Sequence, residues 1–157
     1  MGTRHLQTVI DKIGRYKLNQ YGQWDGYPSY QGVKLLHFLR DNDLEVYEEQ
    51  VSKLRHFTEE EVVEIEKLDD AKLEESFPQL NRDTGYKIHD LIYNGQVNKV
   101  FLATFEDTRY CVGKYTVDFL WNIFTIEYNG YVWSYELNNL PSDDDFLKRF
   151  NKVENYE

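Results

Sequence analysis

Apolar and polar residues partly alternate in two short segments near the start of the chain. Residues 5–10 (HLQTVI) and 15–20 (RYKLNQ) flank Gly14. A period of two is typical of a half-buried strand, and a glycine between two such runs favours a tight turn. This pattern predicts a β-hairpin.

The apolar period becomes helical after residue 32. Three runs carry apolar residues at this spacing: Val33, Leu35, Leu36 and Leu39; then Leu44, Tyr47, Val51 and Leu54; and later Tyr86, Ile88, Leu91 and Ile92. Ser29, directly after Pro28, is the expected N-cap of the first helix, and Thr58 with Glu61 fits a capping box. Pro78 and Gly85 break the segment before the last run, which Gly95 closes.

From Lys99 onward, β-branched and aromatic residues dominate. The segment KVFLATFED at 99–107 and residues 109–137 predict three or four antiparallel strands, with Asn129-Gly130 as a hairpin turn. Pro141 and Ser142 then lead into a C-terminal helix. The order of elements favours an α+β fold, in which an antiparallel sheet combines the N-terminal hairpin with the C-terminal strands and the helices are inserted between them. A length of 157 residues fits a single domain over residues 1–157.

The charge is unevenly distributed. The segment 41–75 holds fourteen acidic and four basic residues, which accounts for the whole net charge of −10. This argues against a nucleic-acid polymer as partner, although the locally basic first twenty residues suit a small anion. The acidic segment is most simply a solvated surface; the alternative is an acidic inhibitor surface that grips a basic host protein or mimics nucleic acid.

No apolar run is long enough to span a membrane, and the N-terminus lacks the apolar stretch of a secretion signal. We therefore expect a cytoplasmic protein without a membrane partner. The single cysteine, Cys111, cannot form an internal disulfide and is interpreted as a buried inert thiol.

The loop at residues 20–32 (QYGQWDGYPSYQG) concentrates aromatic rings and glycines. Aromatic rings offer faces on which bases stack, for about 1–3 kcal/mol each, and glycines allow close approach of backbone with its amide donors. Arg4 is the nearest basic residue for a phosphate. The alternative is structural: the rings plug the end of the sheet, and Asp25-Gly26 is only a turn.

Catalytic and metal chemistry find less support in the residue spacing. The four histidines form none of the usual ligand patterns, so no metal site is predicted, and the glycine spacing does not match nucleotide-binding fingerprints. Ser29 does not lie in a nucleophile elbow. An N-terminal-nucleophile hydrolase with Thr3 and His5 as catalytic residues is the enzymatic alternative, but it needs processing beyond Met1 and Gly2.

The segments MGTRHL, QYGQWDGYPSYQG, LNRDTGYKIHDLI and YELNNLPSDDDFL together resemble a widespread family of small proteins found mostly in bacteriophage genomes. Its pattern runs G-T-R-H-L, then Q-Y-G-Q-W-D-G-Y-P-S-x-Q-G, then R-D-T-G. Phage proteins of this size and type include nucleotide sponges that counter cyclic-oligonucleotide (CBASS) immunity. Tyr30 departs from the pattern, since the family often has glycine there.

The resemblance implies a non-enzymatic protein that sequesters a cyclic dinucleotide such as cyclic GMP-AMP, intact and without a cofactor, in the host cytoplasm. It also implies a symmetric homo-oligomer, a dimer or tetramer. The expected ligand-binding residues are Thr3, Arg4, His5, Gln20, Tyr21, Gln23, Trp24, Asp25, Tyr27 and Tyr30. Asp25 either orients Arg4 or accepts from a guanine. Arg82 and Asp83 join this site or lie outside it, and helix capping is the favoured role of Asp83.

Overall fold

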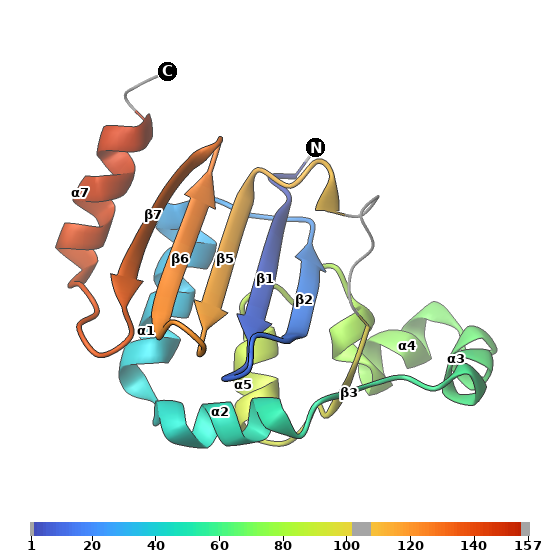
Figure 1. The fold of residues 1–157 in the computed structure, drawn as a ribbon. Coiled ribbons are helices and arrows are strands. Elements are labelled where there is room, and N and C mark those ends of the chain that lie inside the picture. Colours follow the sequence, from blue (N-terminus) through green and yellow to red (C-terminus); the bar gives the residue numbers. More distant parts are fainter. Residues whose placement is uncertain (1, 102–107, 155–157) are drawn as a thin grey trace.

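The computed structural model describes residues 2–101 and 108–154, with side chains through residue 151. Its centre is a five-stranded sheet in the order β2-β1-β5-β6-β7 (Figure 1). The strands are β1 (His5–Ile10), β2 (Tyr16–Gly22), β5 (Gly113–Asp118), β6 (Ile123–Tyr128) and β7 (Tyr131–Glu136). The predicted α+β fold is confirmed, with a mostly antiparallel sheet built from the N-terminal hairpin and the C-terminal strands.

Two hairpins follow directly from local sequence. Gly14 has a positive φ in the turn between β1 and β2, and Asn129 and Gly130 both have positive φ between β6 and β7. This conformation at both central residues explains why Asn-Gly is favoured in a two-residue turn. One pairing differs from the prediction, because β1 lies parallel to β5. The chain leaves the hairpin, passes through the helices and returns beside β1, and parallel neighbours need such a crossover.

Helices occupy the middle of the chain. They are the π-helix η1 (Pro28–Gly32), the α-helices α1 (Val33–Asp41), α2 (Leu44–Ser52), α3 (Glu59–Glu66), α4 (Asp70–Ser76) and α5 (Lys87–Tyr93), and the 3-10 helix η2 (Pro78–Leu80). The capping box of Thr58 and Glu61 is confirmed. The prediction for Ser29 is wrong: Pro28 occupies the first turn, Tyr27 is the N-cap position, and no side chain caps this helix. A π-turn thus precedes α1.

The segment at Lys99 forms only a short strand within the described residues. β4 (Lys99–Val100) pairs with β3 (Arg55–His56) in a separate two-stranded sheet. The remainder of the strand predicted at 99–107 lies almost entirely outside the described residues, which resume at residue 108.

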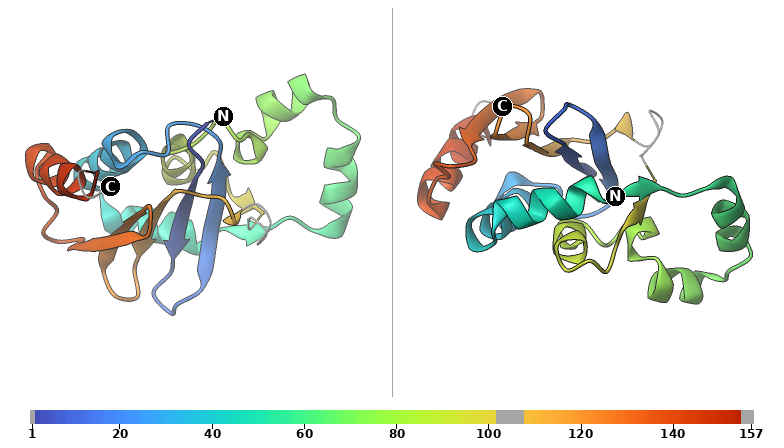
Figure 2. Two further views of the ribbon diagram at one scale, coloured as in Figure 1. Left: turned by 90° about the horizontal axis from the view of Figure 1, so that it is seen from above. Right: turned by 60° about the horizontal axis from the view of Figure 1, so that its bottom comes forward.

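The core lies between one face of the sheet and the helices. Figures 1 and 2 show α1, α2 and α5 against this face, while α3 and α4 lie beyond the β2 edge. Leu36 and Leu39 of α1 and Ile88 of α5 are buried against Val117 and Phe124 of the sheet. The C-terminal helix α7 (Asp143–Glu154) is capped by Ser142, as predicted, and it stacks Phe146 on Phe124.

Candidate functional site

Three of the four motif segments, those with GTRHL, QYGQWDGYPSYQG and RDTG, meet at one end of the sheet. They enclose a cavity of about 80 Å³ lined by His5, residues 24–25, residues 30–31 and residues 82–87, here called the motif pocket. These segments lie far apart in the chain. Pockets for whole drug-sized ligands usually measure about 300–1,000 Å³, so this one can enclose a phosphate or the edge of a base, with the rest of a ligand outside.

The buried amide of Gln31 joins the two loops of the pocket. Its Oε1 accepts the backbone N–H of Tyr86 at 2.9 Å, and its Nε2 donates to the carbonyl of Trp24 at 3.3 Å. Gly85 has a positive φ, and a Cβ there would approach the Gln31 amide to within 3.0 Å. Position 85 in the RDTG motif therefore requires glycine, because any side chain there would prevent the backbone from lying this close to the Gln31 amide.

Further contacts fix the aromatic loop against residues 82–86. The indole Nε1 of Trp24 donates to the Asp83 carboxylate at 2.6 Å, and the backbone N–H of Gln23 donates to the carbonyl of Arg82 at 2.9 Å. The Tyr30 ring contacts the edge of Tyr86. Trp24 and Tyr30 nevertheless remain 46% and 42% exposed, so their rings are available at the rim.

The glycines of the aromatic loop pack inward. A Cβ on Gly22 would lie 2.1 Å from Nε2 of His5, and one on Gly26 would lie 2.6 Å from the carbonyl of Thr3. The amide of Gly26 already donates to Thr3, and its carbonyl accepts from the Tyr115 hydroxyl at 2.6 Å. Gly22 and Gly26 thus anchor the loop to the sheet, while the rings of Trp24, Tyr27 and Tyr30 are each more than 40% exposed. The glycines therefore fit the structural interpretation of this loop, and the exposed rings fit the ligand-binding interpretation.

A buried chain of hydrogen bonds ends at the pocket. The Tyr47 hydroxyl contacts Nδ1 of His89 at 2.5 Å, Nε2 of His89 contacts Oε1 of Gln7 at 2.8 Å, and Nε2 of Gln7 contacts Nδ1 of His5 at 3.3 Å. All four side chains are fully buried. Among the described residues, Nε2 of His5 has no hydrogen-bond partner.

The orientation of Gln7 sets the direction of this chain. Burial lowers the pKa of His5 to about 4, and burial with the nearby His5 lowers the pKa of His89 to about 3, so both rings are neutral at pH 7. Because the Gln7 oxygen only accepts, His89 donates through Nε2 and accepts at Nδ1 from Tyr47. The Gln7 amide donates to Nδ1 of His5, which leaves the proton of His5 on Nε2. The chain therefore ends in an unpartnered N–H donor.

Charged groups of both signs surround the pocket. Arg82 and Lys87 are exposed, and neither has an ion-pair partner among residues 2–101 and 108–154. Asp25 and Asp83 supply carboxylates on the same lining. Cations suit the phosphates of a nucleotide, and carboxylates suit the N–H groups on the edge of a guanine.

The structure brings together only part of the predicted ligand-binding set. His5, Trp24, Asp25 and Tyr30 line the pocket. Arg4 does not line it, since its guanidinium lies 5.8 Å from the centroid of the Tyr110 ring. The predicted orientation of Arg4 by Asp25 is therefore replaced by this ring contact.

The remaining predicted residues lie around the pocket or away from it. The carbonyl of Thr3 holds the loop, and Gln23 reaches the pocket segments through its backbone. Gln20 is buried on β2, and Tyr21 donates to the side chain of Gln23. Tyr27 packs near Tyr128.

Arg82 and Asp83, whose place relative to the site the sequence left open, both line the motif pocket. The predicted capping role of Asp83 is wrong, because α5 begins at Lys87 with Tyr86 as its N-cap position and no side-chain cap. The Asp83 carboxylate instead accepts from Trp24.

Sequence reasoning missed the residues that support the pocket from within. Gln7, Gln31, Tyr47 and His89 are polar groups buried in the fold. Two signals in the sequence could have indicated such buried polar groups: Gln7 on a predicted strand and His89 on the apolar face of a predicted helix. A polar residue that faces inward needs a hydrogen-bond partner. The partner of Gln7 lies 82 residues away, which local patterns cannot reveal.

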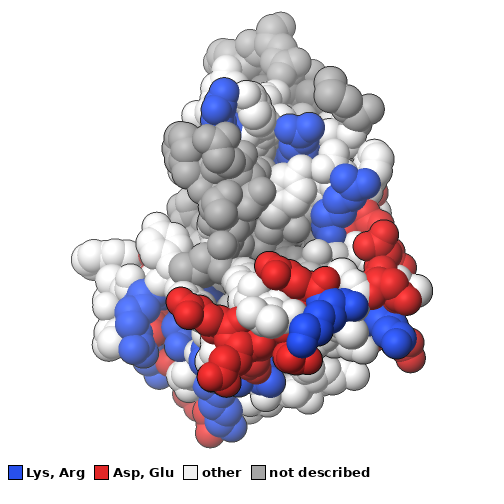
Figure 3. Space-filling view, turned by 90° about the vertical axis from the view of Figure 1, so that its right-hand side faces the viewer, with Lys and Arg blue, Asp and Glu red and all other residues white. Residues whose placement is uncertain are grey.

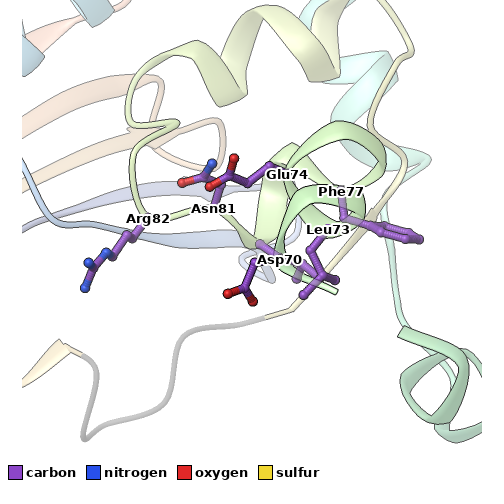
Figure 4. Close-up of a pocket in the computed structure, with 7 residues that line it drawn as sticks. Asp70, Leu73, Glu74, Phe77, Asn81 and Arg82 are labelled. Atoms are coloured by element: carbon purple, nitrogen blue, oxygen red, sulfur yellow. The ribbon is translucent and has the colours of Figure 1, made fainter. Parts of the chain in front are cut away.

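Two more hollows adjoin the loop at residues 81–87. One of about 230 Å³ has Leu73 and Phe77 on its lining together with Asp70 and Glu74 (Figure 4). Figure 4 shows the Arg82 side chain extending away from these apolar residues. The other measures about 580 Å³, and four of its lining residues also line the motif pocket: Asp83, Thr84, Tyr86 and Lys87. A ligand seated in the motif pocket therefore has an adjoining concave surface on which to lie.

The acidic segment carries paired charges on one side of the molecule. Figure 3 shows acidic and basic side chains interspersed on this face. Glu61 pairs with Arg55 at 2.7 Å and with Lys99 at 2.9 Å, and Lys67 pairs with Glu64. This mixture favours the interpretation of a solvated surface over that of a nucleic-acid mimic. Cys111 is partly buried.

Comparisons with protein-family models, with curated proteins and with solved structures find no match to this chain. Within residues 2–101 and 108–154, no helix is both long and apolar enough to cross a membrane. The same residues contain no group of three side chains suited to hold a metal ion.

Proposed function

We propose that this protein binds and sequesters a cyclic dinucleotide at the motif pocket without cleaving it. The observation that carries the proposal is the fully buried His5, which lines the pocket and whose Nε2–H donor has no partner among the described residues. A buried donor without a partner costs about 1–3 kcal/mol. The Nε2 edge of the ring lies against Gly22, so a small shift of the aromatic loop would let an acceptor oxygen of a ligand reach this donor and remove that cost.

The remaining groups on the lining suit the rest of such a ligand. Trp24 and Tyr30 present half-exposed rings on which purines stack. Arg82 can pair with a phosphate, in the role that the sequence assigned to Arg4. Asp25 or Asp83 can accept from the N–H edge of a guanine. A nucleotide is a ligand class that combines these features.

Sequestration rather than hydrolysis is proposed because His5 is held as a donor by Gln7. Its Nδ1 is occupied and its pKa is lowered to about 4, so Nε2 does not accept a proton near neutral pH. Such a group stabilises a bound anion but does not act as a general base. The role of Thr3 and His5 in an N-terminal-nucleophile hydrolase stays an alternative, which product analysis tests.

The experiment is a calorimetric screen of the purified protein against cyclic di- and trinucleotides, followed by heat release and mass analysis of the ligand. We expect tight binding of a cyclic dinucleotide and its recovery intact. Arg82→Ala should weaken binding at least about tenfold, whereas Lys67→Ala, which removes one exposed cation at the C-cap of α3, should not. Recovery of a linear nucleotide would favour the hydrolase, and no binding to the panel would overturn the proposal.

A further inference from the structure

The end of the sheet opposite the motif pocket carries a group of exposed apolar side chains. The turn between β1 and β2 and the turn between β5 and β6 lie at this end, beside α2 (Figure 1). Ile13, Leu120 and Trp121 on these turns are 69%, 46% and 73% exposed. The two turns touch, since a Cβ on Gly14 would lie 3.2 Å from a methyl of Leu120. We call these three residues the turn patch.

The backbone of the turn that carries Trp121 is held by several hydrogen bonds. The carboxylate of Asp118 accepts the backbone N–H groups of Leu120 and Trp121, at 2.9 and 3.1 Å. Asn122 follows with a positive φ, and its carbonyl accepts the N–H of Leu137. A turn whose backbone is already fixed loses little backbone entropy on binding, and tryptophan is enriched at the energetic centres of interfaces.

A hollow lies next to the turn patch. It measures about 310 Å³, has Leu44, Phe119 and Leu137 as its apolar lining, and includes Asn122, the neighbour of Trp121. Its volume falls in the range of pockets that hold a bulky apolar group. A protruding indole and an apolar hollow thus adjoin on the same surface.

The charges on the rim of this hollow are also complementary. Lys12 lies on the side of the sheet turns, and Glu45 and Glu48 lie on the side of α2. Lys12 is 66% exposed and forms an ion pair of 3.6 Å with Glu48 of the same chain, and Glu45 is exposed beside this pair. In a two-fold arrangement, the basic side of one copy faces the acidic side of the other, which adds attraction between the copies.

We propose that this end of the sheet is a dimer interface, in which Trp121 of each copy inserts into the 310 Å³ hollow of the other. A two-fold interface uses the same surface on both copies, so that surface must carry both a protruding group and the hollow that accepts it. The turn patch supplies the protruding ring, and the adjoining hollow can accept it. The adjacency of ring and hollow lets both insertions occur in a single interface. This inference goes beyond the proposed function and does not depend on it, because the motif pocket lies at the other end.

The test is sedimentation equilibrium of the full chain over a range of concentrations. We expect a dimer with micromolar affinity, since the turn patch and the lining of the hollow hold fewer residues than the roughly 20–30 per partner of a standard interface. Trp121→Ala should weaken the dimer at least about tenfold without changing the thermal midpoint of unfolding, measured at a concentration low enough that both chains are monomeric. Val63→Ala, which truncates an exposed apolar side chain on α3, is the matched control and should leave the dimer unchanged.

A second pair of variants tests insertion itself. Asn138→Trp adds a bulky ring at the exposed rim of the hollow and should also produce a monomer. Mixed with Trp121→Ala, it should form a heterodimer, because one partner supplies the ring and the other the open hollow. A wild-type chain that stays monomeric, or a dimer indifferent to Trp121→Ala, would overturn the proposal. So would a monomer whose Trp121 is instead required for binding to lipid vesicles or to a different protein.

Discussion

The indole Nε1 of Trp24 donates a 2.6 Å hydrogen bond to the carboxylate of Asp83, 59 residues further along the chain. This bond fixes the orientation of a half-exposed ring at the rim of the motif pocket. It also joins the aromatic loop to the RDTG segment, so two motifs that look independent in the sequence form one site.

Trp24→Ala should weaken binding of the cyclic dinucleotide by about tenfold or more, because stacking on an aromatic ring contributes about 1–3 kcal/mol per base. Asp83→Ala should weaken it less, because the ring remains but loses its fixed orientation. Titration calorimetry measures both effects. Trp121→Ala, which removes an exposed indole at the other end of the sheet, is the control and should bind as the wild type does. Unchanged affinity of Trp24→Ala would exclude a stacking role.

Gly22→Ala should destabilise the fold by about 1–3 kcal/mol, because its Cβ would overlap the buried His5 ring, 2.1 Å from Nε2. The three nearest atoms to that Cβ all belong to His5. His5→Ala in the same chain should therefore relieve the clash, and the double variant should be less destabilised than the sum of the two single variants. Urea unfolding of all four chains measures the coupling. Strict additivity would mean that His5 moves away from Gly22 at no cost.

Local sequence predicts the elements of the fold better than it predicts their neighbours. The Asn129-Gly130 turn and the Thr58–Glu61 capping box depend on residues a few positions apart, and both are correct. The parallel pairing of β1 with β5 depends on the path of about one hundred intervening residues, which no local pattern encodes.

The same limit explains what was found and missed in the site. Trp24 and Tyr30 were predicted because exposed rings among glycines are conspicuous. Gln31 was missed, because its importance comes from a bond to Tyr86, 55 residues away. Asp83 was predicted as a cap because aspartate often caps helices, but α5 begins four residues later and leaves its carboxylate for Trp24.

Gln31→Leu should lower stability by about 1–3 kcal/mol and weaken ligand binding together. The substitution removes the acceptor of the Tyr86 N–H and the donor to the Trp24 carbonyl, so partly buried backbone groups lose their partners. Thermal unfolding and calorimetry measure the two effects. Gln50→Leu is a matched control, since it removes one side-chain bond to the carbonyl of Tyr93, away from the motif pocket, and should leave affinity unchanged. Equal losses of affinity in both variants would contradict a specific role for Gln31.

The stability of the protein should fall with acidification because of the two buried histidines. Burial lowers the pKa of His5 to about 4 and that of His89 to about 3, both from 6.5. Below pH 6.5 the unfolded chain therefore binds protons that the folded chain excludes. The contribution of the two histidines to the free energy of unfolding is complete above about pH 6.5 and is lost progressively as the pH falls toward 4. Near pH 5, the free energy of unfolding should change with a slope of about 2–3 kcal/mol per pH unit for two such groups.

Substitution of these histidines should reduce that slope. Urea unfolding between pH 7 and 5 measures it before most carboxylates titrate. His89→Gln and His5→Gln should each remove about half of the slope attributed to the pair, although each also lowers stability at pH 7 by disrupting the chain through Gln7. His56→Gln, an exposed histidine on β3, is the control and should leave the slope unchanged. The slope of stability against pH counts the protons taken up on unfolding and does not depend on lost contacts. A wild-type slope in the variant with both histidines replaced would therefore show that His5 and His89 are not held neutral. The assignment of His5 Nε2 as a donor would then be wrong.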